Sequence, residues 1–365
     1  MTKIMSLISS LLALLSCSPD GTWKDLDVKG FAAAAADGAV LVDVRTPEEY
    51  AVGHFPGAVN VNWFSDDFLT RMEASFPKDL PLAIYCRSGK RSAAAAARLS
   101  KAGYTGVSNL LGGYLAWTGA GEAVSRYEAE TFVTPGGHPV TLTLIKHGTL
   151  EIRFAGRSIQ VDPVCGLGKP TDYAVEFPKA DLILITHEHG DHLDPEALKA
   201  LTGERTRLFL NGTSAGKLAG VEGIPAPEVL ANGDSRIVPL GPPRLESSVQ
   251  PGDVIVEAVP AYNTTPGREK FHPAGNGNGY VLTLDGLRIY IAGDTEDIPE
   301  MAQLKDIDIA FLPCNQPYTM TPDQCVRAAQ AFSPKVLIPY HFGETDLSSL
   351  PGRLPGMKVL LRQMQ

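Results

Sequence analysis

The sequence predicts an α/β protein of two domains: an N-terminal parallel sheet with flanking helices, and a C-terminal sandwich of two sheets with helices outside. Three observations support this prediction. The chain has 365 residues, which is long for one domain and enough for two buried cores. Short apolar runs alternate with helical stretches in its first third, as expected for parallel strands. Runs of strands joined by turn residues fill most of the remainder.

Composition excludes several other classes of protein. Hydrophobic residues make up 44% and charged residues 20% of the chain, which is typical of a folded globular protein. The 41 acidic residues outnumber the 32 lysines and arginines, so the formal net charge is −9. A protein that binds the nucleic-acid backbone needs a clustered basic surface, and we therefore expect no nucleic-acid partner. Five cysteines without close spacing indicate neither a disulfide framework nor a cysteine zinc site.

Residues 1–17 are predicted to be an export signal. Lys3 precedes an apolar stretch, residues 4–15, which would span about 18 Å as a helix and is too short for a hydrocarbon core of about 30 Å. Residues 14–17 (LLSC) resemble a bacterial lipoprotein signal, in which the cysteine is lipidated after cleavage. We therefore expect an exported protein of the cell envelope that contacts the membrane only through a lipid on Cys17. Ordinary signal cleavage is the alternative.

Residues 22–122 are predicted to form the first domain. Short β-branched apolar runs indicate buried parallel strands at residues 39–44, 58–61 and 82–85. The clearest helix, at residues 92–102, is rich in alanine and is followed by a glycine, which is common just after helix ends. This succession of strands and helices predicts a parallel sheet covered by helices.

The chemistry of this domain is predicted to centre on Cys86, which directly follows a predicted strand. The loop after it leads into the alanine-rich helix and consists of Arg87, Ser88, Gly89, Lys90 and Arg91. Backbone N–H groups of the loop and the helix N-terminus would lower the pKa of the thiol and favour a thiolate. The same loop suits a bound phosphate or a persulfide. A small, buried, structural cysteine is the non-functional alternative.

Three further segments make this domain resemble the rhodanese family: residues 43–50 (DVRTPEEY), 53–58 (GHFPGA) and 112–117 (GGYLAW). The resemblance implies that Cys86 accepts a sulfane sulfur from a donor as a persulfide and passes it to a thiol acceptor. It also implies that residues 87–91 shape the pocket. Asp43, Arg45 and His54 are then framework residues rather than catalysts.

Residues 128–365 are predicted to form the second domain, after a small polar linker. Strands are predicted at residues 140–145, 150–154, 158–161, 182–185, 254–259, 280–284, 288–291 and 336–338. Helices are predicted at residues 195–201, 298–304 and 322–332. Runs of strands interrupted by helices suit a sandwich of two sheets with the helices on its outer faces.

The strongest motif in the chain is His-Glu-His-Gly-Asp-His, directly after a predicted buried strand. In an extended segment, side chains two positions apart point the same way, so His187 and His189 can bind one ion. Gly190 lets the chain turn and bring Asp191 and His192 towards a neighbouring ion. Imidazole and carboxylate ligands suit zinc, manganese or iron. A metalloprotease helix of the H-E-x-x-H type is excluded, because the second histidine of that pattern is missing.

In its context this motif resembles the metallo-β-lactamase fold, an αββα sandwich. Asp162 follows an earlier predicted strand, Asp294 lies in a Gly-Asp-Thr segment after a later one, and His341 ends the last. The resemblance implies two divalent cations, with zinc favoured and manganese or iron as alternatives. Asp294 would bridge them, Asp191 would bind metal and take part in catalysis, and Asp162 would orient a ligand histidine. Segments 261–263, 277–280 and 319–321 look most like the lactonase-like and phosphodiesterase-like hydrolases of this fold.

One position departs from the pattern of that fold. Relatives carry a further metal-binding histidine before the Gly-Asp-Thr segment, where residues 259–263 (VPAYN) have none. His272 is predicted to replace this ligand. The alternative is that the first cation keeps His187, His189 and the shared aspartate, with water completing its shell. His147 could face the same cleft or lie on the surface or in the core.

The chain is therefore predicted to be an enzyme with a sulfurtransferase-like domain and a metal-dependent hydrolase domain. The hydrolase would act on a small-molecule lactone, ester, thioester or phosphodiester. One alternative is a sulfur-oxidising persulfide dioxygenase, which would contain one iron and consume oxygen. Another is that the first domain is a thiol-sensing module that regulates the hydrolase. Metal content and oxygen uptake distinguish hydrolysis from oxidation.

Overall fold

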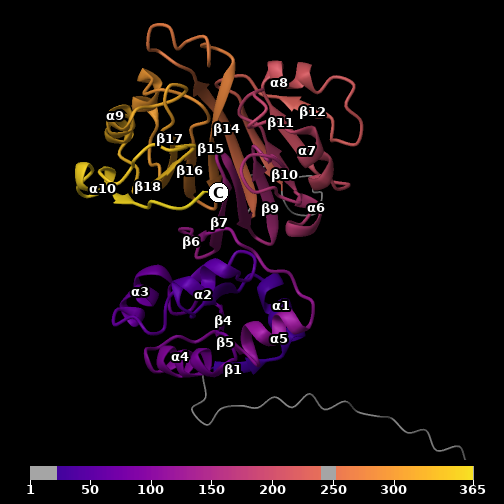
Figure 1. The fold of residues 1–365 in the computed structure, drawn as a ribbon, viewed down its shortest axis with the longest axis vertical. Coiled ribbons are helices and arrows are strands. Elements are labelled where there is room, and N and C mark those ends of the chain that lie inside the picture. The colour runs from indigo at the N-terminus through magenta and orange to yellow at the C-terminus, as the bar shows by residue number, and fades with distance from the viewer. Residues whose placement is uncertain (1–22, 240–251, 365) are drawn as a thin grey trace, which may run out of the picture. The chain divides into compact units, whose positions relative to one another are not determined.

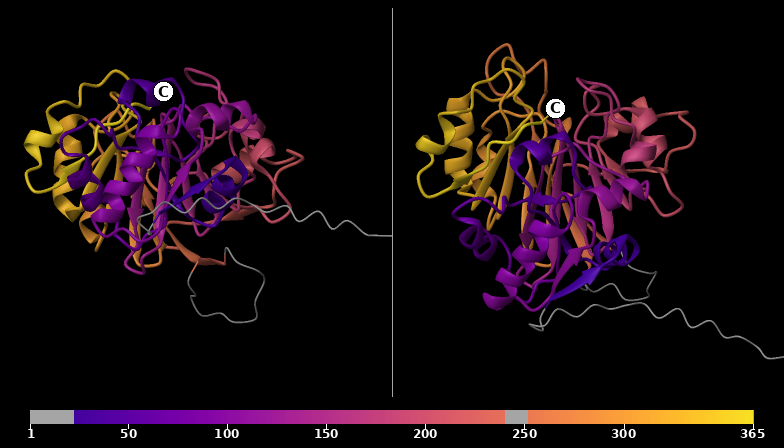
Figure 2. Two further views of the ribbon diagram at one scale, coloured as in Figure 1. Left: turned by 90° about the horizontal axis from the view of Figure 1, so that it is seen from below. Right: turned by 60° about the horizontal axis from the view of Figure 1, so that its bottom comes forward.

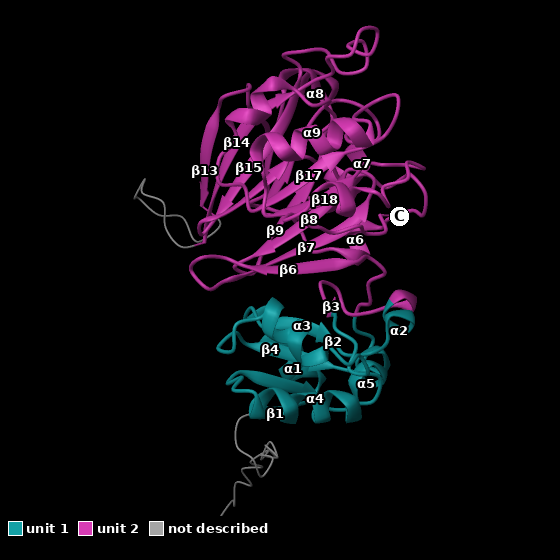
Figure 3. Ribbon diagram, turned by 90° about the vertical axis from the view of Figure 1, so that its left-hand side faces the viewer, with its two compact units in different colours: residues 1–50, 60–122 teal, residues 51–59, 123–365 magenta. Residues whose placement is uncertain are grey.

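The structure, a computed structural model, describes residues 23–239 and 252–364 (Figure 1). The chain divides into two compact units, which are coloured separately in Figure 3. Unit 1 comprises residues up to 50 together with 60–122, and unit 2 comprises 51–59 together with the chain from 123 onwards. The predicted signal and its Cys17 lie outside the described residues, so export and lipid attachment stay predictions. Within the described ranges, no helix is long and apolar enough to cross a membrane.

The short segment 51–59 belongs to unit 2, although the sequence placed it within the first domain. Its central residue, His54, pairs with Ser125 in both directions, with N···O distances of 2.9 and 2.6 Å. The His54 ring also makes a 2.8 Å hydrogen bond to the carbonyl of Tyr127. His54 is buried, so these bonds fix the segment against the chain that begins unit 2.

Unit 1 is built on a sheet whose strands, among the described residues, have the order β1-β5-β4-β2-β3. The strands are β1 (Trp23–Leu26), β2 (Val40–Asp43), β3 (Val59–Asn60), β4 (Leu82–Tyr85) and β5 (Val107–Leu110). The helices are α1 (Val28–Ala36), α2 (Pro47–Val52), α3 (Phe68–Ser75), α4 (Lys90–Lys101) and α5 (Gly113–Gly119). The pairs β1–β5, β5–β4 and β4–β2 are parallel, which confirms the predicted parallel sheet with flanking helices.

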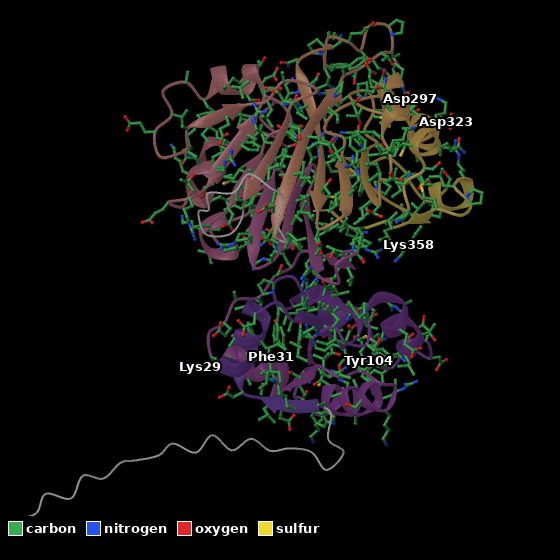
Figure 4. All side chains as sticks on the ribbon, turned by 180° about the vertical axis from the view of Figure 1, so that it is seen from behind. Lys29, Phe31, Tyr104, Asp297, Asp323 and Lys358 are labelled. Carbon is green, nitrogen blue, oxygen red and sulfur yellow. The ribbon has the colours of Figure 1, made fainter. Side chains whose placement is uncertain are left out.

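The core of unit 1 forms where helices cover its central strands. Every residue of β4 is buried, which explains why this strand reads as a continuous apolar run. Phe31 of α1, labelled in Figure 4, packs edge-on against Tyr85 of β4 and Trp117 of α5, with ring centroids 6.4 and 6.2 Å apart. These contacts bring α1 and α5 together over the strand that ends at Cys86.

Unit 2 contains two sheets, each with seven strands within the described ranges. The first sheet consists of β6 (Ala129–Val133), β7 (Pro139–Lys146), β8 (Thr149–Phe154), β9 (Arg157–Val161), β10 (Leu182–Leu184), β11 (Arg207–Leu210) and β12 (Pro227–Val229). The second consists of β13 (Ser235–Pro239), β14 (Asp253–Ala261), β15 (Gly277–Leu284), β16 (Leu287–Ile291), β17 (Ile309–Pro313), β18 (Val336–Tyr340) and β19 (Lys358–Val359). In each sheet, antiparallel strands on one side continue into parallel strands on the other.

Helices cover the outer faces of both sheets, as Figure 1 shows and the views of Figure 2 repeat. The first sheet is covered by α6 (Tyr173–Glu176), α7 (Pro195–Leu201) and α8 (Gly212–Lys217), and the second by η1 (Pro299–Gln303), α9 (Pro322–Phe332) and α10 (Leu350–Arg353). One apolar cluster fills the space between the sheets, and separate clusters lie beneath α7 and beneath α9. This layering confirms the predicted αββα sandwich.

The helix predicted at residues 298–304 is a short 3₁₀ helix, η1. Asp297, just before it, pairs with Arg327 of α9 at 2.8 Å, and Asp323 of α9 pairs with Arg353 of α10 at 2.7 Å. Both aspartates are labelled in Figure 4, at the outer side of this helical layer. The apolar faces of the layer point to the sheet and its charged ends face solvent.

Lys146, the last residue of β7, is fully buried and carries its ammonium group into the interior of unit 2. Its Nζ donates to the carbonyls of Cys165, Gly166, Leu167 and Lys169, at distances between 2.7 and 3.3 Å. Burial lowers the pKa of this lysine. The four carbonyls replace the water that the ammonium loses, and the contact fixes the loop after β9.

We expect Lys146→Met to destabilise unit 2 by about 1–3 kcal/mol, because buried carbonyl groups lose their donor. Urea unfolding followed by circular dichroism measures the change. All three tryptophans, Trp23, Trp63 and Trp117, lie in unit 1, so the transition seen by tryptophan fluorescence should not move. Lys335→Met serves as the matched control, since that side chain is 78% exposed. Equal stability of the two variants would contradict the role given to Lys146.

Candidate functional site

Asp162, the residue after β9, fixes the loop that carries the metal-binding motif. Its carboxylate is fully buried and accepts hydrogen bonds from the backbone N–H and the hydroxyl of Thr186, both at 2.7 Å. The same carboxylate accepts a 2.8 Å hydrogen bond from Nδ1 of His192. Because Nδ1 carries the proton, Nε2 of His192 is left to face the centre of the site. The structure thus gives Asp162 the orienting position that the resemblance implied.

The first group of candidate ligands consists of His187, His189 and His272. Nε2 of His187 and Nδ1 of His189 lie 3.0 Å apart, so two histidines separated by one residue converge on one point. His272 arrives from a distant loop, and its ring centroid lies 5.0 Å from that of His187 and 5.1 Å from that of His189. The predicted replacement ligand therefore lies beside the other two.

The second group of candidate ligands consists of Asp191, His192 and His341, together with His147. Nε2 of His192 and Nε2 of His341 each lie 3.7 Å from one carboxylate oxygen of Asp191. His341 directly follows β18 and has a left-handed backbone, with a φ of 44°. A residue other than glycine rarely adopts this backbone conformation without support, which here includes the hydrogen bond from the His341 N–H to the carbonyl of His147.

Asp294 lies between the two groups. One of its carboxylate oxygens is 3.2 Å from Nε2 of His272 and 3.3 Å from Nε2 of His341. The other oxygen is 3.4 Å from Nε2 of His192. A single carboxylate that touches members of both groups has the position of a ligand shared by two cations.

The donor atoms of this site fit a bound divalent cation. Four of them are buried and lack a hydrogen-bond partner within the described part of the chain: Nε2 of His192, His272 and His341, and one oxygen of Asp294. Buried polar atoms without a partner are costly, and a cation at their centre would satisfy them together. Histidine nitrogens with carboxylate oxygens form the ligand set expected for zinc, manganese or iron.

Electrostatics also favour a cation at this place. Burial lowers the pKa of His187 well below its usual value and lowers that of His189, so both rings are neutral and offer a lone pair. Burial would raise the pKa of Asp294, but the surrounding histidines, His341 first, hold it well below its usual range. His187 and His189 therefore present neutral imidazoles and Asp294 an ionised carboxylate, the forms that bind metal. Burial would lower the pKa of His192, but the carboxylates around it, Asp294 first, raise it to about 9, so a cation bound there would displace a proton.

The loop that delivers His272 is held by contacts far apart in sequence. Asn263 N donates to the carbonyl of His272 at 2.9 Å, and Nδ1 of His272 donates to the carbonyl of Tyr318 at 3.2 Å. Glu296, fully buried, accepts hydrogen bonds from the backbone N–H groups of Thr264 and Thr265 at 2.8 and 2.6 Å. These contacts fix the tautomer and the orientation of His272, with Nε2 facing the site.

A small opening beside the first group gives access to the candidate ligands. Glu188 forms one wall, where its carboxylate accepts two 2.9 Å hydrogen bonds from the amide of Asn276. Phe271 lines the opening from the His272 loop and packs edge-on against Tyr318, with ring centroids 5.1 Å apart. A substrate approaching the site therefore meets one polar and one aromatic wall.

In unit 1, Cys86 lies at the end of β4 with its side chain directed into the loop that precedes α4. The thiol is buried, and the Ser92 hydroxyl donates to its sulfur at 3.4 Å. Burial by itself would raise the pKa of Cys86, but hydrogen bonds from the side chain and backbone of Ser92 and the backbone of Ser88 and Arg91 lower it. The loop therefore stabilises a thiolate, as the sequence predicted.

The cations of this loop have different positions. Arg91 forms two hydrogen bonds, of 2.7 and 2.8 Å, with the carboxylate of Glu49 and lowers the pKa of that carboxyl to about 2. Arg87 and Lys90 are exposed. Gly113 closes the loop from behind, where a Cβ would lie 2.2 Å from the carbonyl of Cys86. The loop after Cys86 thus combines an anchored arginine, Arg91, with two exposed cations, Arg87 and Lys90, and a close backbone contact at Gly113.

The structure brings all the metal-site residues predicted from the sequence into one cluster, with Asp162 behind it. For two further residues, His147 and Ser92, the sequence did not show whether they lie at a site. His147 joins the second group, and its sequence signal was only its place in a turn between two strands. Ser92 contacts the thiol of Cys86, and its signal was its position in the first turn of the helix. Buried ion pairing of Arg45 with Asp43 agrees with a framework role for both.

Fold and site together define a metal-binding αββα sandwich joined to a small parallel-sheet unit with a reactive cysteine. Residues 141–341 match the family model of the beta-lactamase superfamily domain, and residues 27–120 match that of the rhodanese-like domain. The chain belongs to the β-lactamase superfamily and carries a rhodanese-like domain in addition.

Relatives of known sequence or structure agree with this assignment. A protein from Ligilactobacillus salivarius named metal-dependent hydrolase is 33% identical over 202 residues, which are 54% of this chain and 82% of that protein. One of the same name from Pyrococcus furiosus is 31% identical over 212 residues, 56% of this chain and 84% of its own. The crystal structure of a protein from Parabacteroides distasonis, assigned as a metal-dependent hydrolase, is 51% identical with a TM-score of 0.58. The match covers 66% of this chain and all of that one.

We expect His272→Ala to weaken the binding of one cation selectively. The affinity should fall by more than about tenfold, because the first group loses its third imidazole. The second group should keep its metal, since Asp191, His192 and His341 are untouched. Titration of metal-depleted protein with zinc in competition with a chromophoric chelator measures both affinities. His138→Ala is the matched control, because that histidine is 55% exposed and pairs with Asp285 instead. Unchanged affinities in His272→Ala would remove His272 from the ligand set.

Proposed function

We propose that unit 2 is a metal-dependent hydrolase that uses two divalent cations to cleave a small-molecule lactone, ester, thioester or phosphodiester. The single observation that carries this proposal is the position of Asp294, whose carboxylate contacts His272 of the first group and both His192 and His341 of the second. The names of the relatives support hydrolysis and the need for metal.

Each of the two groups would bind one cation. His187, His189 and His272 would hold one cation, Asp191, His192 and His341 the other, and Asp294 would be shared. When bound, two cations would lower the pKa of a shared water and polarise the oxygen of the substrate. Asp162 keeps His192 in the tautomer that leaves Nε2 free. The side chain of Asp191 is 35% exposed, whereas those of His192 and His341 are almost fully buried.

Metal analysis combined with a substrate panel tests this proposal. Purified full-length protein should contain two divalent ions per chain and should hydrolyse at least one member of a panel of lactone, ester, thioester and phosphodiester substrates. Chelation should abolish the activity and added zinc or manganese should restore it. A single iron with oxygen consumption on glutathione persulfide would contradict hydrolysis and favour the sulfur-oxidising alternative.

For unit 1 we propose sulfur transfer through a persulfide on Cys86. The lowered pKa of this thiol supports attack by a thiolate on a sulfane-sulfur donor. The exposed cations Arg87 and Lys90 suit an anionic donor, and the N–H groups of the loop suit a persulfide anion. In the first step the Cys86 thiolate attacks the outer sulfur of the donor, and the remainder of the donor leaves as an anion, such as sulfite from thiosulfate. In the second step an acceptor, such as a thiolate or cyanide, attacks the outer sulfur of the persulfide and releases Cys86 as a thiolate.

We expect Cys86→Ser to abolish sulfur transfer from thiosulfate to cyanide, because the serine hydroxyl cannot form a persulfide. Thiocyanate formation measures the activity. Metal content and hydrolysis by unit 2 should be unchanged, since its ligands belong to a separate core. Cys165→Ser provides the control for removal of a free cysteine from the chain. Full transfer activity in Cys86→Ser would show that the sulfur is carried elsewhere.

A further inference from the structure

We propose that His147 is a positioning residue of the metal centre that holds Asp191 and His341 in place without itself binding the cation. This inference rests on the metal centre proposed above and gives His147, which lies among the candidate ligands of the second group, a role other than metal binding. His147 lies in the turn between β7 and β8, far in sequence from both of the residues that it contacts.

The side chain of His147 reaches Asp191 directly. Its Nε2 lies 3.1 Å from a carboxylate oxygen of Asp191, closer than the two imidazole nitrogens of the second group, which are both 3.7 Å away. This is the distance of an N–H donor to a carboxylate. A ring nitrogen that donates its proton to Asp191 has no lone pair left for a metal. The contact therefore orients the carboxylate and leaves the other donor atoms to bind.

The ring and backbone of His147 also hold His341. The two imidazole rings pack with centroids 3.6 Å apart and planes tilted by 41°. The backbone N–H of His341 donates to the carbonyl of His147 at 2.9 Å. Both residues have left-handed backbones, with φ of 46° and 44°. Two strained turns that support each other in this way define the position of the ligand at the end of β18.

Gly148, the residue after His147, lets the turn pack closely against His192. A Cβ at that position would lie 2.8 Å from Cε1 of His192. The turn therefore packs against the back of His192 while His147 contacts Asp191 and His341. One short turn thus touches three members of the second group, and within the described residues it makes no hydrogen bond or ion pair with a member of the first group. Its effect should be confined to the second cation.

Two substitutions separate positioning from metal binding. In His147→Gln the side-chain amide nitrogen can reach the place of Nε2, so the hydrogen bond to Asp191 is kept and the imidazole is lost. In His147→Asn the amide is one methylene shorter and cannot reach Asp191, while asparagine tolerates the left-handed backbone well. His138→Asn is the matched control on an exposed histidine of the same unit.

The experiment measures metal affinity rather than activity alone. Metal-depleted full-length proteins are titrated with Co²⁺, whose visible absorption reports the geometry of each site, and with zinc against a chelator. We expect His147→Asn to lower the affinity for one of the two cations by roughly 10- to 100-fold, as does the loss of a group that orients a ligand. The Co²⁺ spectrum of that site should also change. His147→Gln should stay within about threefold of the native protein, the range left by a preserved hydrogen bond.

Other results would overturn the proposal. An equal loss of affinity in both variants would make His147 a metal ligand, because the imidazole itself would then be required. Unchanged binding in His147→Asn would show that the contact with Asp191 does not position it. Titration of the native protein distinguishes failure of this proposal from failure of the proposed function. If it bound no cation, the metal centre would fail, whereas binding by the native protein and the Asn variant alike would contradict only the role of His147.

Discussion

The buried carboxylate of Asp162 is the contact on which the metal centre depends. It accepts hydrogen bonds from the backbone N–H and the hydroxyl of Thr186 and from the ring of His192. These bonds fix the loop after β10 at both of its ends. Its own backbone N–H donates to Leu184, and its carbonyl accepts from the hydroxyl of Thr149. One residue therefore joins the ends of three neighbouring strands. Because an unpaired carboxylate in this interior would be costly, the loop has one favourable arrangement, and in that arrangement its histidines converge.

The conformational strain of this arrangement lies in a few turns. His147, Asp162 and His341 all have left-handed backbones, which for residues other than glycine costs about 1–3 kcal/mol each. Such strain persists only where the surroundings enforce it. Here the apolar cluster between the two sheets holds the strands, and hydrogen bonds between strand ends, such as that from Gly293 to the hydroxyl of Tyr340, hold the turns. A well-packed sandwich thus supports ligands in positions that a flexible loop could not keep.

In both units the candidate site follows the ends of parallel strands, but one site stabilises an anion and the other favours a cation. In each, a parallel strand ends and the next residues form a site: Cys86 after β4, and His187, Asp294 and His341 after β10, β16 and β18. Backbone N–H groups and the start of α4 face the sulfur of Cys86 and stabilise an anion. Carboxylates and imidazoles face one another in unit 2 and favour a cation. The chain therefore combines a thiolate site and a metal site on related sheet edges.

The sequence by itself determined those features that neighbouring residues encode. Periodicity and turn residues were enough to predict the parallel sheet and the sandwich. The HEHGDH motif was enough to predict four candidate ligands, because side chains two positions apart on an extended segment point the same way. The sequence was also enough to predict Cys86 and its loop. The helix predicted at residues 298–304 is present as the 3₁₀ helix η1, and the sequence pattern did not distinguish the type of helix. Segment 51–59 belongs to unit 2 and not to the first domain, because His54 pairs with Ser125, which is far away in sequence. Only the tertiary structure decided where His272 and His147 lie. His272 depends on Asn263, Tyr318 and Glu296, and His147 on Asp191 and His341, and no local pattern records contacts between residues so far apart along the chain.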